Sequence, residues 1–204
     1  HDDFNKWFWY RMLWNPHLDA ESITAEYCRY WFGPDAVEEA VEAIFLMEET
    51  LEKPAIDNIG IARAVELLRS AGSKIPENLL RTDYRWRVIL QKALMDRYIQ
   101  LELQRGQALK EEAGRILTRV GDSDNPRADV ARAIKVLDKP LETSEMETVI
   151  EEARRLGEES NEVIGYRVPA SFIVETFDLT EINWWKKTLQ EALASEDDAR
   201  ARNG

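Results

Sequence analysis

Cysteine and histidine are scarce in this sequence. Its 204 residues contain one cysteine, Cys28, and two histidines, His1 and His17. A single cysteine cannot form an internal disulfide, and so few nitrogen and sulfur ligands exclude the usual zinc sites. The Glu-x-x-His pairs that hold two metal ions in a helical bundle are absent too. We therefore predict no metal and no other cofactor, and an inert, buried thiol at Cys28, which stands among aromatic residues.

Catalytic motifs and long apolar runs are also missing. The chain has neither the Gly-x-Ser-x-Gly turn of a serine hydrolase nor a phosphate-binding loop ending in Gly-Lys. It has no run of about 18 apolar residues, so no membrane span is predicted. No signal peptide is visible, but the chain starts at His1 without a methionine and could be a piece of a longer protein. The residues themselves assign no compartment.

Basic residues are outnumbered by acidic ones. The chain has 27 lysines and arginines against 39 aspartates and glutamates, a net charge of −12. This charge repels phosphate backbones, so nucleic acid is not an expected partner. Five arginines come nearest to a basic patch, but Asp83, Asp96 and Glu102 are interleaved with them, which predicts a solvated helix face. The five are Arg81, Arg85, Arg87, Arg97 and Arg105.

Aromatic residues are concentrated at the start of the chain. Ten of the nineteen lie within the first 32 positions, and four of these are tryptophans. Between Phe4 and Trp14, large apolar side chains occupy nearly the whole circumference of a predicted helix, and a helix that is apolar on all sides must be buried on all sides. One bundle covers only part of such a surface. We therefore predict that at least two of these rings are exposed in the isolated chain or are covered by a second copy.

Helical spacing and helix caps recur along the whole chain, which predicts an all-α fold. We expect an irregular bundle of seven or eight helices around one long helix at about 82–120, which no proline interrupts. Residues 1–195 are predicted to form a single domain, and 196–204 a frayed tail. Asp19 and Asn125 are expected to cap helices, and Ser144 with Glu147 to form a capping box. The segment 166–178 lacks helical spacing and is predicted to be extended.

Two kinds of side chain leave a functional reading open. Asp2 and Asp3 are the carboxylates next to the aromatic cluster, where they could act in acid catalysis or, as we favour, cap the first helix. The tryptophans could stack on sugars, although tryptophan in a helical stripe is more often core. Trp9 and Trp184 are the better candidates for exposure.

The opening stretch resembles a known class of protein. "DDFNKWFWYRMLWNP" followed by "ITAEYCRYWFGP" is similar to the end of the catalytic region in large bacterial glycoside-hydrolase-like proteins with a (β/α)8 barrel. These are loosely similar to alpha-glucuronidases and hexosaminidases. Asp2, Asp3, Asn5 and Lys6 match one element of the pattern, Trp14, Asn15 and Pro16 a second, and Phe32 with Gly33 a third. The stretch "TFDLTEINWWKK" is similar to tail segments of the same proteins.

The resemblance implies that this chain is the helical C-terminal region that follows a barrel. Residues just before such a helix face the substrate in these barrels, so His1, Asp2, Asp3 and Asn5 become candidate substrate-facing residues. The first helix would pack on the barrel of the same parent chain, with an interface drawn from Phe4, Trp7, Phe8, Trp9, Met12 and Leu13. Export to the periplasm or beyond the cell would fit the resemblance.

The expected role is therefore structural. The chain alone is predicted to be non-catalytic and to buttress a sugar-processing barrel or its substrate cleft, while the parent protein could be a glycoside hydrolase. The alternative is a free-standing α-helical module that binds a protein partner, or a second copy of itself, through the aromatic first helix.

Overall fold

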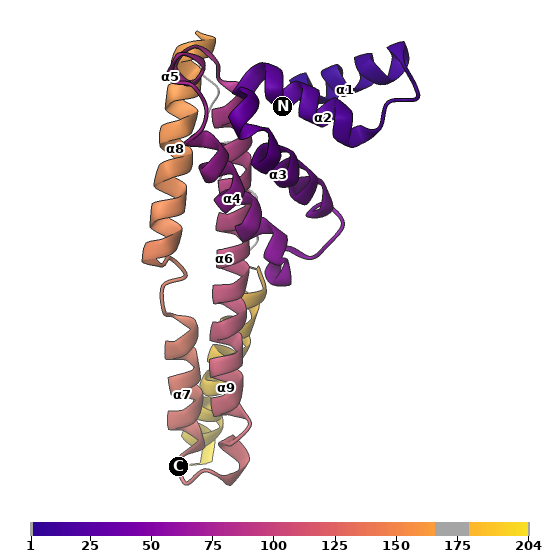
Figure 1. Ribbon diagram of the computed structural model, residues 1–204. Coiled ribbons are helices and arrows are strands. Elements are labelled where there is room, and N and C mark those ends of the chain that lie inside the picture. The colour runs from indigo at the N-terminus through magenta and orange to yellow at the C-terminus, as the bar shows by residue number, and fades with distance from the viewer. Residues whose placement is uncertain (1, 166–179, 204) are drawn as a thin grey trace. The chain divides into compact units, whose positions relative to one another are not determined.

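The chain folds entirely as helices and turns in the part that the structure describes, which confirms the predicted all-α class. The computed structural model describes residues 2–165 and 180–203, and no strand occurs among them (Figure 1). The predicted extended segment at 166–178 lies outside this range. The α-helices are α1 (Asp2–Trp14), α2 (Ala20–Phe32), α3 (Val37–Glu49), α4 (Ile59–Gly72), α5 (Glu77–Thr82), α6 (Arg85–Leu117), α7 (Pro126–Leu137), α8 (Ser144–Ile164) and α9 (Thr180–Asn203).

The number of helices differs from the prediction. The described residues form nine α-helices, whereas seven or eight were expected. The additional one is α5, a six-residue helix just before the start predicted for the long helix at about 82. Pro76 precedes it with an extended backbone, and the Leu80 amide donates to the Pro76 carbonyl, which closes the first turn. The long helix is present as α6, and a short 3₁₀ helix follows it at Val120–Asp122.

The described residues divide into two compact units, where the sequence predicts one domain. The first takes in residues 2–100 and 144–165, and the second takes in residues 101–143 and 180–203. Helix α6 therefore contributes its first half to one unit and its second half to the other.

Helices α1 to α4 begin the first unit, and their ends follow local signals. The Asp19 carboxylate accepts a 2.8 Å hydrogen bond from the Ser22 amide, so Asp19 caps α2 as predicted. Gly33 ends α2 with a φ of 92°, in the region that favours glycine. Pro34 then starts a single 3₁₀ turn that leads into α3. Asn58 caps α4 by accepting a hydrogen bond from the Gly60 amide.

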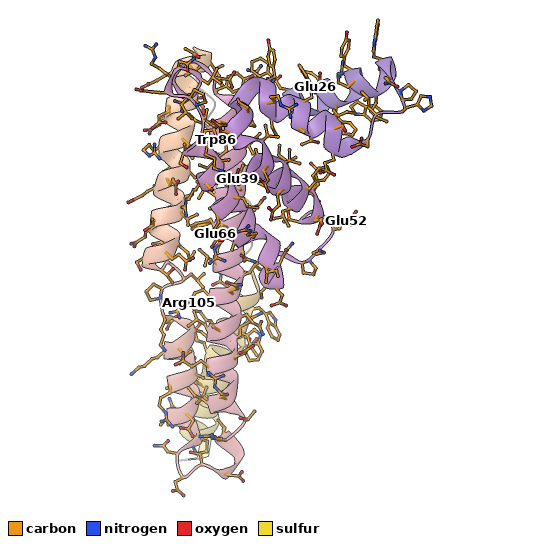
Figure 2. All side chains as sticks on the ribbon, viewed as in Figure 1. Glu26, Glu39, Glu52, Glu66, Trp86 and Arg105 are labelled. Atoms are coloured by element: carbon orange, nitrogen blue, oxygen red, sulfur yellow. The ribbon has the colours of Figure 1, made fainter. Side chains whose placement is uncertain are left out.

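The core of the first unit lies between these helices, the start of α6 and α8. Arg87 on α6 pairs with Glu159 on α8 at 3.0 Å, and Arg97 pairs with Glu145 at 2.6 Å, so the two segments run antiparallel. Trp86 is buried at the start of α6 (Figure 2). The other fully or almost fully buried side chains of this core include Ile23, Tyr27, Phe32, Ile44, Leu68, Leu90, Leu94, Met146 and Leu156.

The second unit has a smaller core of its own. Leu109 and Ala113 of α6 pack on Ala133 and Leu137 of α7. Trp185 and Leu189 of α9 are partly buried against them. The Lys186 ammonium pairs with Asp138 at 3.0 Å, which ties α9 to the end of α7. Helix α9 continues to Asn203, so the backbone is helical through most of the segment predicted to be a frayed tail.

Candidate docking surface

Helix α1 has an inner and an outer face. Successive helical residues are rotated by about 100°, so side chains three or four positions apart share a face. Phe4, Phe8 and Met12 form one such stripe, and each of these side chains is partly buried. Trp9 and Leu13 form another stripe and are exposed by 67% and 82%. The two stripes therefore lie on different faces of α1, one packed and one exposed.

The inner face packs on α2 through aromatic rings. The Phe4 ring meets Tyr27 edge-on at 5.2 Å between centroids, and the Trp7 ring meets Tyr27 at 6.0 Å. Tyr27 itself is buried and makes an edge contact with Phe32 at 5.8 Å. Such edge contacts are favourable because the positive edge of one ring lies over the negative face of another. This cluster anchors α1 to the core of the first unit.

A salt bridge strengthens the same contact. Arg11, on the inner side of α1, lies 2.8 Å from a carboxylate oxygen of Glu26 on α2. Glu26 is labelled in Figure 2. Arg11 is three residues from Phe8 and four from Trp7, so it belongs to the packed side of the helix. The orientation of α1 about its own axis is thus fixed by both apolar and charged contacts.

The outer face is aromatic and uncovered in this chain. Trp9, Tyr10, Leu13 and Trp14 occupy a continuous arc, since positions 9, 10, 13 and 14 are neighbours on a helix. Trp14 is 77% exposed and Tyr10 is 63% exposed. The prediction that at least two rings of α1 are exposed is confirmed. We refer to Trp9, Tyr10, Leu13 and Trp14 as the outer face of α1.

The amount of apolar surface on this face is large for one short helix. A large aromatic side chain carries about 150–250 Å² of surface. Three such rings exposed by more than half present on the order of 300–400 Å², and covering them would contribute several kcal/mol at about 25 cal/mol per Å². The largest apolar patch on a typical monomer has about this size and is often functional. The geometry of α1 therefore suits docking of another folded surface.

Asp3, a candidate substrate-facing residue, is held in a cluster of charged and aromatic groups. The Tyr84 hydroxyl donates to Asp3 Oδ2 at 2.6 Å, and Arg85 Nη2 lies 3.0 Å from the same oxygen. Arg85 Nη1 also donates to Asp83 Oδ2 at 2.6 Å. The guanidinium of Arg85 stacks over the Trp31 ring, 3.6 Å from its centroid, in a cation–π contact.

This cluster decides what the Asp3 carboxyl can do chemically. The hydrogen bond from Tyr84 and the charge of Arg85 hold the pKa of Asp3 below its usual range, and the same hydrogen bond raises the pKa of Tyr84. A general acid needs the opposite shift, because it must keep its proton near neutral pH. Asp3 therefore ties the start of α1 to the start of α6.

The other candidate substrate-facing residues are only partly placed. His1 and the side chain of Asp2 lie outside the described part of the structure. Asn5 is exposed near the start of α1. Asp3 and Asn5, the two candidates whose side chains are described, lie on the same turn of α1.

The remaining candidates from the sequence that the structure describes do not come together in one site. Cys28 is buried, as predicted, and burial raises the pKa of its thiol to about 12, which disfavours the reactive thiolate. Trp184 on α9 is exposed, as expected, and its ring meets Trp185 edge-on. No group of three or more potential metal ligands is found among the described residues. None of the described helices is long and apolar enough to cross a bilayer.

Sequence reasoning missed the role of the arginines. They were predicted to line a solvated helix face, but Arg85, Arg87 and Arg97 are partly buried and bind carboxylates on other segments. Arg87 also donates to the Asp83 carbonyl at 2.8 Å. The signal available in the sequence was the adjacency of Tyr84 and Arg85 to Asp83 at a helix start, which does not reveal that the partner is Asp3, about 80 positions earlier.

Comparisons with known proteins add no family to these observations. No family model, curated protein or solved structure matches the chain. The residues and the geometry of α1 are therefore the basis for assigning a function.

Proposed function

We propose that this chain is a non-catalytic helical C-terminal region of a sugar-processing, glycoside-hydrolase-like protein, and that α1 is the helix on which the catalytic barrel packs. The observation that carries the proposal is the outer face of α1, where Trp9, Leu13 and Trp14 are uncovered while the opposite face is anchored in the core. The resemblance of the segment around Asp2–Pro16 to the end of such barrels supports the choice of partner.

The anchoring of α1 is what makes the outer face a usable surface. An aromatic helix with nothing to hold it would turn its rings inward. Here the Phe4–Tyr27 contact, the Arg11–Glu26 salt bridge and the Asp3 cluster fix one side, so the exposed rings are presented in one orientation. A surface that is already ordered loses little conformational entropy on docking. This arrangement suits a buttress between a barrel and a helical domain.

The same face supports a second candidate function. A free-standing interaction module would also present an aromatic helix, and a symmetric contact between two copies of α1 would cover it. The two candidates differ in what covers the outer face: a barrel of the same polypeptide, or a separate protein molecule.

Two measurements separate the candidates. The reading frame upstream of His1 is expected to encode several hundred residues in which strand and helix patterns alternate, as a (β/α)8 barrel requires. A start codon directly before His1 would contradict the barrel. Sedimentation of the isolated chain at increasing concentration then tests the symmetric contact, because a stable dimer supports the interaction module.

The absence of activity in the isolated chain is testable as well. Assay of the purified chain against a panel of aryl glycosides is expected to give no turnover above a heat-denatured sample. Clear turnover that is lost on substitution Asp3→Asn would overturn the non-catalytic role.

A further inference from the structure

A cavity of about 250 Å³ opens in the first unit beside the Asp3 cluster. It lies between the start of α1, the end of α3 and the start of α6, with α2 contributing Tyr27. Its walls are mainly apolar, formed by the side chains of Phe4, Tyr27, Ile44, Met47, Leu51, Val88 and Ile89. None of the outer-face residues of α1 is part of this lining, so the cavity is a separate feature from the proposed docking surface.

The polar groups around the cavity are largely engaged with one another. Asp3, Tyr84 and Arg85 form the cluster already described, and Lys92 binds both carboxylate oxygens of Asp96 at 2.5 Å. The remaining charged lining residue is Glu48, an exposed side chain at the rim without an ion-pair partner among the described residues. No cation in the lining is therefore left to bind an anion, and the Glu48 carboxylate repels one.

The size and chemistry of the cavity select the class of ligand. An apolar cavity of about 150 Å³ is known to hold benzene, so one of about 250 Å³ has room for two fused rings. A sugar would need a hydrogen-bond partner for each hydroxyl, and most of the lining is apolar, while Asp3, Tyr84, Arg85 and Lys92 are already bound to other side chains. The polar groups left for a ligand are those of Asn5, Tyr27 and Glu48, too few for the hydroxyls of a sugar ring. We propose that this cavity binds a small, uncharged aromatic molecule of about the size of naphthalene or indole.

The chain carries its own reporters for this proposal. It has four methionines, Met12, Met47, Met95 and Met146, and only Met47 lines the cavity. With ¹³C-methyl methionine, titration with 2-naphthol is expected to shift the Met47 resonance saturably, with a Kd on the order of 100 µM for a ligand of this size. Met146, buried elsewhere in the core, should not move. Naphthalene-2-sulfonate has the same ring system but carries a negative charge, which the Glu48 carboxylate repels. It should bind about tenfold more weakly than 2-naphthol, or worse.

Matched substitutions test the location. Val88→Phe places a ring inside the cavity, and Val130→Phe makes the same change on α7 in the second unit. The first is expected to weaken 2-naphthol binding by about tenfold or more, and the second to leave it unchanged. Circular dichroism confirms that each variant is folded. Should Val88→Phe not fold, the Met47 shift and the comparison of neutral with anionic ligand decide the question.

Three results would overturn the proposal. One is a Met47 resonance that does not move with 2-naphthol up to its solubility limit. Another is a shift confined to Met12, which would place the ligand on α1 instead. The third is a folded Val88→Phe variant that binds as well as the parent chain. Each of these leaves the docking role of α1 untouched, because the outer face is not involved.

Discussion

The Tyr84 hydroxyl donates a 2.6 Å hydrogen bond to Asp3, and this joins the first turn of α1 to the residue just before α6. The same carboxylate oxygen receives Arg85 at 3.0 Å. The rings of Phe4 and Trp7 also pack on Tyr27. Together these contacts hold α1 so that Trp9 and Leu13 point away from the core. The exposed aromatic face is therefore a consequence of how the other side of the helix is fixed.

Removing the Tyr84 hydroxyl tests this link. Tyr84→Phe is expected to lower the free energy of unfolding by about 1 kcal/mol, the lower part of the range for a hydrogen bond to a charged group, because Asp3 is partly exposed. Tyr10→Phe removes a hydroxyl from an exposed ring of α1 and should change nothing measurable. Urea unfolding of both variants at pH 7 provides the comparison.

The contribution of this link depends on pH in a defined direction. The pKa of Asp3 is lower in the folded chain than its ordinary value of 3.8, so the folded state binds that proton less tightly. The stabilisation is present above the ordinary pKa and is lost as the pH falls through the lower, folded value. The difference between the parent chain and Tyr84→Phe should therefore narrow below about pH 4. A difference that grows on acidification would contradict the assignment.

Arg85 should not be replaceable by lysine. Its planar guanidinium stacks on Trp31 while binding both Asp83 and Asp3, and an ammonium group cannot do all three. Arg85→Lys is expected to destabilise the chain by about 1–2 kcal/mol. Arg81→Lys, at an exposed position four residues earlier, is the control and should have no effect. Equal melting temperatures for the two variants would mean that the stacking contributes nothing.

Two glycines in helices should respond oppositely to alanine. A Cβ at Gly72 would lie 2.5 Å from a ring carbon of Trp86, so Gly72→Ala is expected to destabilise the chain by about 1–3 kcal/mol. A Cβ at Gly114, on α6, would meet no atom within 4 Å. Gly114→Ala should therefore stabilise by up to about 1 kcal/mol through helix propensity. Thermal melts of both variants measure whether each change raises or lowers the melting temperature. A higher melting temperature for Gly72→Ala would contradict close packing of Trp86 on Gly72.

The ends of helices were largely predictable from the sequence, because caps act locally. Asp19 and Asn125 cap their helices through hydrogen bonds to amides three positions on, a geometry that sequence spacing alone sets. Ser144 was predicted to be the residue that caps α8, but it is already the first residue of that helix. Helix α5 was missed because a six-residue helix between a proline and an aspartate leaves too little periodic pattern to recognise.

The candidate site was less predictable, because it depends on contacts between distant residues. The all-round apolar character of α1 indicated an uncovered face, and the separation of the Phe4 stripe from the Trp9 stripe follows from helical geometry. Nothing in the sequence pairs Asp3 with Tyr84 or Trp31 with Arg85. Those contacts arise from the packing of α1 and α2 on the start of α6. They give Asp3, a candidate substrate-facing residue, a structural link to the start of α6.

The most direct test of the docking role compares the accessibility of the outer face of α1 in two polypeptides. A thiol placed by Leu13→Cys, and one placed at exposed Glu66 on α4 by Glu66→Cys, are labelled with maleimide in the isolated chain and in the product of the complete reading frame. The native Cys28 is buried, and burial raises its pKa, so it should remain unlabelled in both. We predict fast labelling at both introduced sites in the isolated chain, and labelling of Leu13→Cys alone slowed by about tenfold or more in the longer product. Equal rates for Leu13→Cys in the two polypeptides would contradict the proposal that a barrel covers α1.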